Sequence, residues 1–177
     1  NIQWLKELQL FNLNKQKALP LVPNRLAVIS IESSQGYSDF YNVLTRNTHK
    51  YHFYIKVFPA TMQGDRAVES IELALQHIER QLNHFDAVAI IRGGGGDVGL
   101  TCYNHINLSK KVAEFPIPVL SGIGHSTNLT VVEMVSHYSG ITPTDLADFL
   151  IKKMEWFERE IDGLSQNMVD ASLGLLD

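Results

Sequence analysis

The chain has 177 residues, of which 45% are hydrophobic, and a formal net charge of −4 at pH 7. This size fits one globular core with an extension, and the lack of a long apolar run or signal-peptide pattern favours a soluble cytoplasmic protein over a membrane or secreted one. The single cysteine, Cys102, excludes an intramolecular disulfide, and the spacing of the seven histidines is not that of a metal site.

Apolar strand-like segments alternate with amphipathic helical segments along most of the chain. The predicted elements, in chain order, are a short amphipathic segment at Gln3–Phe11, a strand at Arg25–Ile31, a helix at Tyr37–Arg46, a strand at Tyr51–Phe58, a helix at Asp65–Leu82, a strand at Ala87–Ile91, a helix at Leu108–Phe115, a strand at Pro118–Ser121 and a helix at Thr127–His137. This alternation predicts an α/β fold, with a parallel, Rossmann-like sheet and helices on both faces.

The last part of the chain has a different pattern. Apolar residues recur at alternating spacings of three and four, namely Met154, Phe157, Ile161, Leu164, Met168, Ala171 and Leu175. Such a heptad seam predicts the start of a long coiled-coil helix, the alternative being a final helix packed on the domain. The segment from Asp145 carries eight acids and three bases, whereas residues 1–144 carry 11 acids and 12 bases. Charge therefore neither supports nor excludes a nucleic-acid partner.

The third predicted strand ends in an arginine followed by four glycines, Arg92–Gly96. Glycines are costly to order, so such a run is expected where the backbone approaches a ligand closely. Exposed amides next to one guanidinium form a phosphate cradle, and ligands of open α/β sheets bind at the carboxyl ends of the strands. The alternative is an ordinary flexible loop.

Polar residues also follow the other three predicted strands, and the carboxyl ends of parallel strands meet at one edge of a sheet. The predicted phosphate- or DNA-binding residues are Ser33, Ser34, Gln63, Gly93, Gly94, Gly95, Gly96, Ser126 and Thr127. His125 follows two glycines and precedes a predicted helix that Ser126 or Thr127 would cap, so a phosphate there would meet free amides and a proton-transferring imidazole. For Asp39, a structural role near a helix start and a functional role are equally open.

From Leu5 to about Leu150 the chain resembles the catalytic region of the exonuclease VII large-subunit family. The resemblance rests on five segments in the family's order and spacing: LAVISIESSQGYSDFYNVL, FPATMQGDRAVESI, IIRGGGGDVGL, PIPVLSGIGHSTNLT and ITPTDLADFL. It implies a bacterial nuclease that degrades single-stranded DNA from either end and releases 5′-phosphorylated oligonucleotides. It also implies that neither a divalent metal nor another cofactor is strictly required.

The resemblance also implies a domain organisation. Residues 1–145 would be the catalytic domain and residues 146–177 the start of a helical arm that binds several copies of a small subunit. The chain would then be a fragment of a longer protein and lack the OB domain that precedes this region in the family. The alternative function is a non-catalytic phosphate- or nucleotide-binding α/β module.

The family's essential polar residues correspond to Asp39, Arg92 and His125, and its last acid after the histidine meets Asn128 here. The family's glutamate after the histidine is likewise Ser126. An asparagine can orient neighbours but cannot carry charge. Whether Asp97 or Glu133 compensates is open. Tyr37, Tyr41 and Tyr103 are expected to stack exposed bases.

Overall fold

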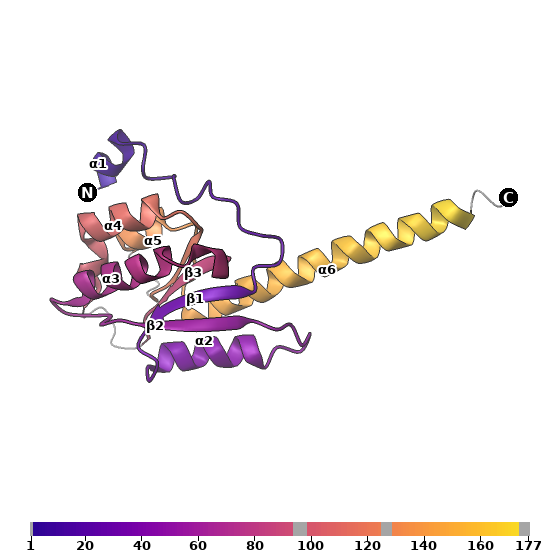
Figure 1. Ribbon diagram of the computed structural model, residues 1–177, viewed down its shortest axis with the longest axis horizontal. Helices are drawn as coiled ribbons and strands as arrows, with labels where there is room; N and C mark the ends of the chain where they lie inside the picture. Colours follow the sequence, from indigo (N-terminus) through magenta and orange to yellow (C-terminus); the bar gives the residue numbers. More distant parts are fainter. Residues whose placement is uncertain (1, 94–98, 125–128, 174–177) are drawn as a thin grey trace.

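The computed structural model describes residues 2–93, 99–124 and 129–173. In chain order, its elements are α1 (Ile2–Glu7), β1 (Arg25–Ser30), α2 (Gln35–Thr45), β2 (Tyr54–Pro59), α3 (Ala67–Glu79), the 3-10 helix η1 (Leu82–His84), β3 (Ala87–Ile91), the 3-10 helix η2 (Leu100–Asn104), α4 (Ile106–Glu114), β4 (Val119–Gly122), α5 (Val131–Val135), β5 (Tyr138–Ser139) and α6 (Pro143–Leu173). Figure 1 shows an α/β body from which most of α6 projects.

The described strands form one parallel sheet of five strands in the order β2–β1–β3–β4–β5. β1 and β3 are neighbours in the sheet although β2 lies between them in the chain. The connection that follows β1 therefore runs to one side of the sheet, and the connection that follows β3 runs to the other. In this arrangement the crevice at the carboxyl ends of β1 and β3 is the expected ligand site. The predicted parallel α/β sheet is confirmed.

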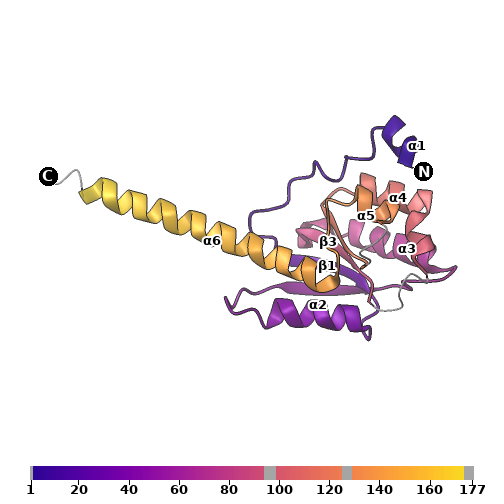
Figure 2. The same ribbon diagram turned by 180° about the vertical axis from the view of Figure 1, so that it is seen from behind.

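Two apolar cores flank the sheet. The core on one face joins side chains of β1 and β3 to α3, α4 and α5, and Ile71, Leu75 and Val112 are fully buried there. On the other face, Phe40 of α2 and Leu146 of α6 are fully buried. Because both faces are covered, β3 is buried at every position, which explains its uninterrupted apolar sequence. Figure 2 shows α2 and α6 from the back.

Most element boundaries shift by a few residues from the sequence-based expectations, and three of the differences have a clear cause. β2 begins at Tyr54 rather than Tyr51, because the side chain of Asn47 hydrogen-bonds both the backbone N–H and the carbonyl of Tyr51 in a turn. The helix predicted at Thr127–His137 is much shorter, since α5 begins at Val131 and ends at Val135. The two-residue strand β5 was missed, as so short a segment has no detectable alternation.

α6 is one continuous helix of 31 residues, about 46 Å long at 1.5 Å per residue. Its first turns bury Leu146, Ala147, Leu150 and Ile151 in the second core, and beyond Phe157 all its described side chains are exposed. The predicted projecting helix is confirmed as far as Leu173, whereas its pairing through the heptad seam stays a prediction. None of the described helices is long and apolar enough to cross a membrane.

The segment between α1 and β1 is anchored by one buried side chain that the sequence did not single out. The Asn14 amide donates to the carbonyls of Phe115 and Ile117, at 3.2 Å each, and accepts from the Val119 backbone N–H at 2.8 Å. All three bonds lie next to the start of β4. Asn14 thus fixes the N-terminal segment to the sheet across about a hundred positions of sequence.

Candidate functional site

The carboxyl ends of β1 and β3 are in direct backbone contact through two glycines. A Cβ atom added to Gly36 would lie 2.3 Å from Gly93 Cα, and one added to Gly93 would lie 2.0 Å from Gly36 N. Ser30 Oγ, at the end of β1, also donates a 2.8 Å hydrogen bond to the carbonyl of Ile91 at the end of β3. The first residue of the glycine run is therefore held against the start of α2.

Gly36 lies in the polar segment predicted after β1 but was not among the predicted binding residues. It occupies the second position of α2, where glycine costs roughly 1 kcal/mol relative to alanine. That local cost was a usable signal, because a glycine so placed indicates close approach of another backbone. The partner, Gly93, was predicted to bind phosphate, and the structure shows that its lack of a side chain also serves packing.

Arg92 lies at this junction and is only 4% exposed. Its backbone N–H donates to the Gly122 carbonyl at 3.2 Å, which ties the end of β3 to the end of β4. Burial raises the pKa values of Cys102 and Tyr103, and the positive charge of Arg92 opposes that rise in both. The guanidinium is therefore close to these two side chains.

The loop after β2 meets Gly99, which lies three residues beyond the glycine run. Gln63 is exposed, and a Cβ added to Gly99 would lie 2.9 Å from Gln63 Cβ. Nearby, the Tyr103 hydroxyl donates a 2.8 Å hydrogen bond to the Met62 carbonyl. Tyr103 is fully buried, so the expectation that it stacks exposed bases is wrong, because tertiary packing places its ring in the core.

Four further predicted residues lie in or just before α2, namely Ser33, Ser34, Tyr37 and Tyr41. Ser34 is its N-cap and accepts a 3.2 Å hydrogen bond from the Tyr37 N–H, while Ser33 is exposed. Capping occupies one acceptor position of the Ser34 hydroxyl. Tyr37 is 9% exposed, so only the neighbouring Tyr41, at 43%, offers substantial ring surface.

Asp39 lies one turn into α2 and is half-buried. Its Oδ1 accepts a 2.6 Å hydrogen bond from Gln35 Nε2, and Gln35 is exposed next to the Gly36–Gly93 contact. The structural alternative for Asp39 was a position near the helix start, but the residue lies one turn beyond that start. Its carboxylate is oriented by a side chain at the rim of the site.

The carboxyl end of β4 completes the site edge together with the start of α6. Added Cβ atoms show the close packing here, since one at Gly122 would lie 3.1 Å from Pro143 Cα. Thr142 and Asp145 fix the start of α6 reciprocally: Thr142 Oγ1 accepts from the Asp145 N–H at 3.1 Å, and Asp145 Oδ2 accepts from the Ile141 N–H at 2.9 Å. A hydroxyl three residues before an acid is a sequence pattern typical of such a helix start.

The helix after β4 is capped by a different residue from the ones predicted. The N-cap of α5 is Thr130, not Ser126 or Thr127, and Thr130 forms a capping box with Glu133. Glu133 Oε2 accepts from both the backbone N–H and the hydroxyl of Thr130, at 2.8 and 2.7 Å, so this carboxylate is committed to the cap. The other predicted site residues here and in the glycine run lie outside the described residues: Gly94, Gly95, Gly96, His125, Ser126, Thr127 and Asn128.

Neither a thiolate nor a metal cluster is found in the described part of the site. Cys102 is buried, burial raises the pKa of its thiol, and its Sγ lies 3.2 Å from the Gly99 carbonyl. Among residues 2–93, 99–124 and 129–173, no group of three histidine, cysteine, aspartate or glutamate side chains is placed to hold a metal ion. Metal-independent chemistry stays a prediction.

Comparison with known proteins agrees with this arrangement. The family model for the exonuclease VII large subunit matches residues 10–176. The chain belongs to the exonuclease VII large-subunit family. The match extends over every candidate site residue, from Ser33 to Asn128, and over all but the last residue of the C-terminal segment.

Individual members of the exonuclease VII large-subunit family match less of their own length. The chain is 35% identical to the exodeoxyribonuclease 7 large subunit of Lactobacillus johnsonii, over 79% of this chain and 30% of that protein. It is 30% identical to the large subunit of Pseudomonas aeruginosa, over 90% and 34%, and 26% identical to that of Koribacter versatilis, over 92% and 35%. The chain thus spans about a third of the length of these relatives.

Proposed function

We propose that this chain is the catalytic region of an exodeoxyribonuclease VII large subunit, which hydrolyses phosphodiester bonds of single-stranded DNA from either end and releases 5′-phosphorylated oligonucleotides. The observation that carries the proposal is the junction at the carboxyl ends of β1 and β3, which we call the switch-point site. There, Gly36 and Gly93 bring two loops into contact, and Arg92 lies beside them. The remaining site residues are assigned from family membership and from the sequence around His125.

Arg92 and the glycine amides have the chemistry to stabilise the charge that develops at phosphorus. A guanidinium that is 4% exposed has lost most of its hydration, so its attraction to a phosphate is stronger than at a protein surface. One well-placed donor of this type contributes about 3–4 kcal/mol to transition-state stabilisation in comparable sites. Arg92 is thus proposed as the main phosphate ligand.

The reaction also needs proton transfer. Water attacks phosphorus, the bond between phosphorus and the 3′ oxygen breaks, and a proton goes to that oxygen, which leaves the phosphate on the 5′ side of the product. We assign proton transfer to His125, an effect on the order of 10²–10⁴ in rate. Asp39 orients His125 or the water, and Asn128 holds a phosphate oxygen or the imidazole.

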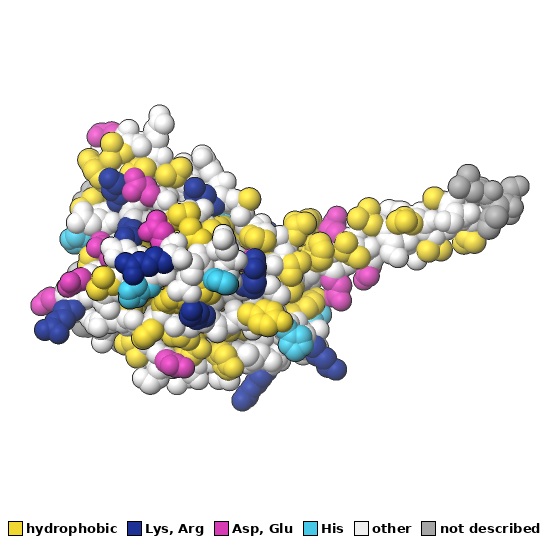
Figure 3. Space-filling view, in the orientation of Figure 1, with side chains coloured by type: hydrophobic (Ala, Val, Ile, Leu, Met, Phe, Trp, Pro, Cys, Tyr) yellow, Lys and Arg dark blue, Asp and Glu magenta, His cyan; other side chains and the backbone are white. Residues whose placement is uncertain are grey.

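The wider assignment follows the same family. The exposed apolar residues of the projecting part of α6, which include Ile161, Leu164 and Met168, form the surface proposed to bind several copies of the small subunit. Figure 3 shows hydrophobic side chains along this projecting helix. The proposed site of action is the cytoplasm, and no metal is assigned.

The test replaces Arg92 with lysine in the intact large subunit assembled with its small subunit. Arg92→Lys keeps the charge and loses the bidentate fork, so cleavage of an end-labelled single-stranded oligonucleotide in the presence of chelator should fall about 100-fold or more. Arg80→Lys, at the exposed end of α3, is the matched control and should cleave like the wild type.

Three outcomes contradict parts of the proposal. Cleavage by Arg92→Lys at the wild-type rate would refute the role of Arg92 as a phosphate ligand. A wild-type complex that binds the oligonucleotide but never cleaves it, with or without added divalent ions, would favour the phosphate-binding module. Cleavage that stops in chelator would refute the assignment of a metal-independent reaction.

A further inference from the structure

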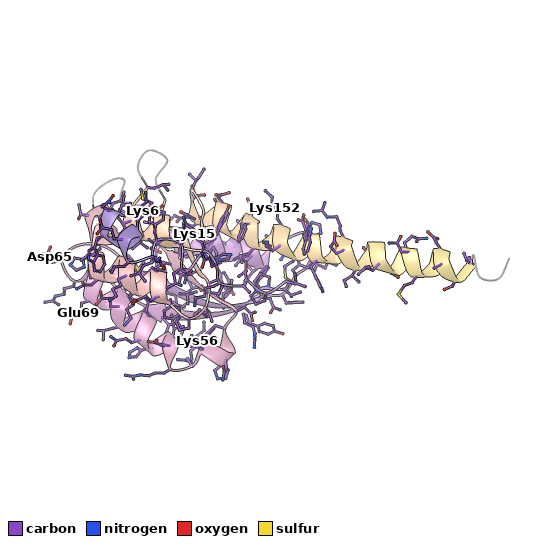
Figure 4. All side chains as sticks on the ribbon, turned by 90° about the horizontal axis from the view of Figure 1, so that it is seen from above. Lys6, Lys15, Lys56, Asp65, Glu69 and Lys152 are labelled. Atoms are coloured by element: carbon purple, nitrogen blue, oxygen red, sulfur yellow. The ribbon has the colours of Figure 1, made fainter. Side chains whose placement is uncertain are left out.

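The first half of α6 presents a hollow that belongs neither to the site nor to the exposed tail of the helix. It has a volume of about 280 Å³ and is lined by Phe149, Lys152, Lys153 and Trp156, a set we call the α6 platform. These residues are three, four and seven positions apart and so share one helix face. Figure 4 labels Lys152 on this part of α6.

The two aromatic side chains of the α6 platform differ in their surroundings. The Phe149 ring is stacked on Tyr138 of β5, with centroids 3.7 Å apart and an interplanar angle of 8°. Lys153 Nζ lies 5.8 Å from the Phe149 centroid. Trp156 is 47% exposed, so nearly half of the largest ring on this face is open to a ligand.

The charges of this part of α6 are divided between two faces. Glu155 pairs with His49 at 3.1 Å and Glu158 accepts from the Tyr51 hydroxyl, so both acids turn toward the loop before β2. No ion pair within 4 Å joins Lys152 or Lys153 to an acid among the described residues. The α6 platform therefore combines open aromatic surface with two lysines, while Glu155 and Glu158 contact the loop before β2.

This combination fits single-stranded nucleic acid better than another protein. Bases stack on exposed aromatic rings without sequence preference, and nearby lysines neutralise the phosphates between them. A protein that packed on α6 through apolar contacts would find more apolar surface farther along, where Leu164 and Met168 are exposed. The two lysines favour a polyanionic occupant.

We propose that the α6 platform is a second contact site for single-stranded DNA, in which a base stacks on Trp156 and Lys152 and Lys153 bind the adjoining phosphates. The inference rests on the proposed function, since it assumes that DNA also reaches the switch-point site. The α6 platform is separated from the switch-point site along the axis of α6. α6 starts against the end of β4 at Pro143, and Trp156 follows thirteen residues later, about 20 Å along the helix.

This separation makes the inference quantitative. A strand stacked at about 3.4 Å per nucleotide needs about six nucleotides to cover 20 Å. Oligonucleotides shorter than this reach only one of the two sites. The α6 platform should therefore strengthen the binding of long single strands at the switch-point site and not that of the shortest ones.

The test measures binding of (dT)4 and (dT)20 to the intact large subunit assembled with its small subunit, in a His125→Ala background that slows proton transfer and keeps the phosphate ligand Arg92. Trp156→Leu should weaken binding of (dT)20 about tenfold and leave (dT)4 unchanged, and Trp156→Phe, which keeps a ring, should recover most of the loss. Lys152→Gln with Lys153→Gln should lower the salt dependence of (dT)20 binding by about 1.4 in log–log slope, at about 0.7 per phosphate contact. The matched control is the pair Lys110→Gln and Lys111→Gln on α4, which should keep the wild-type slope.

The outcomes separate the inference from the proposed function. If the wild-type complex cleaves and binds (dT)20 but none of the Trp156 and lysine variants changes (dT)20 binding, the α6 platform is not a DNA site. If Trp156→Leu instead releases the small subunit or changes the mass of the assembly, the surface is a protein interface and the inference is overturned. If the wild-type complex neither binds nor cleaves any single strand, the proposed function itself fails.

Discussion

Replacing Gly36 with alanine tests whether the contact between the two central loops sets the geometry of the site. The added Cβ would lie 2.3 Å from Gly93 Cα, 2.7 Å from Gly93 N and 3.0 Å from the Arg92 carbonyl oxygen. Carbon atoms in van der Waals contact are about 3.5–4.0 Å apart, so the backbones must separate by about 1.2 Å or more. All three neighbours are backbone atoms, so no side-chain rotation relieves the clash.

The expected effect on activity is larger than the effect on stability. Overpacking typically costs about 1–3 kcal/mol, so the unfolding free energy should fall by about that amount. A displacement of about 1 Å near reacting groups lowers rates about 100-fold. Single-turnover cleavage of a labelled oligonucleotide by the assembled complex, with thermal unfolding of the same samples, measures both quantities.

Gly163→Ala is the matched control, because nothing lies within 4 Å of a Cβ added at this exposed position of α6. It should leave cleavage unchanged and stabilise the helix slightly. Gly36→Ala with wild-type cleavage would refute the argument that the Gly36–Gly93 contact positions Arg92. Equal losses of activity in Gly36→Ala and Gly163→Ala would refute it as well.

Three further predictions concern stability. Asn14→Ala should lower the free energy of unfolding by about 3 kcal/mol in denaturant titration, since it leaves buried backbone groups without their partner at about 1–3 kcal/mol each, whereas exposed Asn12→Ala should change it little. Thr130→Ala should cost about 1 kcal/mol through loss of the capping box and Thr130→Ser should not, so equal melting of the two would contradict the cap. Burial lowers the pKa of His137 below its usual 6.5, so the unfolded chain binds more protons and stability should fall as pH drops through about 6.5 toward the folded pKa. His137→Gln should flatten that pH dependence, and an unchanged slope would exclude His137 as its source.

The elements could be predicted from the sequence because their signals are local. The uninterrupted apolar run Ala87–Ile91 indicates a strand covered on both faces, and the structure buries all five positions. The heptad seam indicates a long helix, and α6 continues to Leu173. Both patterns depend only on which residues follow one another.

Convergence of the predicted site segments also follows from the sequence, since parallel strands end at one edge. The structure brings Gly36 to Gly93, Gln63 to Gly99 and the backbone of Arg92 to Gly122. Tyr103 is the counterexample. Its position near the glycine run indicated a base-stacking ring, but a core on that face of the sheet encloses the ring completely.

The sequence alone determined the element types, the parallel sheet, the helical arm and the residues at the strand ends. Only the tertiary structure decided that β1 and β3 are neighbours, that the backbone approaching Gly36 is that of Gly93 and that Asn14 bonds to carbonyls about a hundred positions away. The physical reason is that backbone periodicity is set within a few residues. Strand order, close approach and burial depend instead on how distant segments cross, and no local pattern in the chain specifies those crossings.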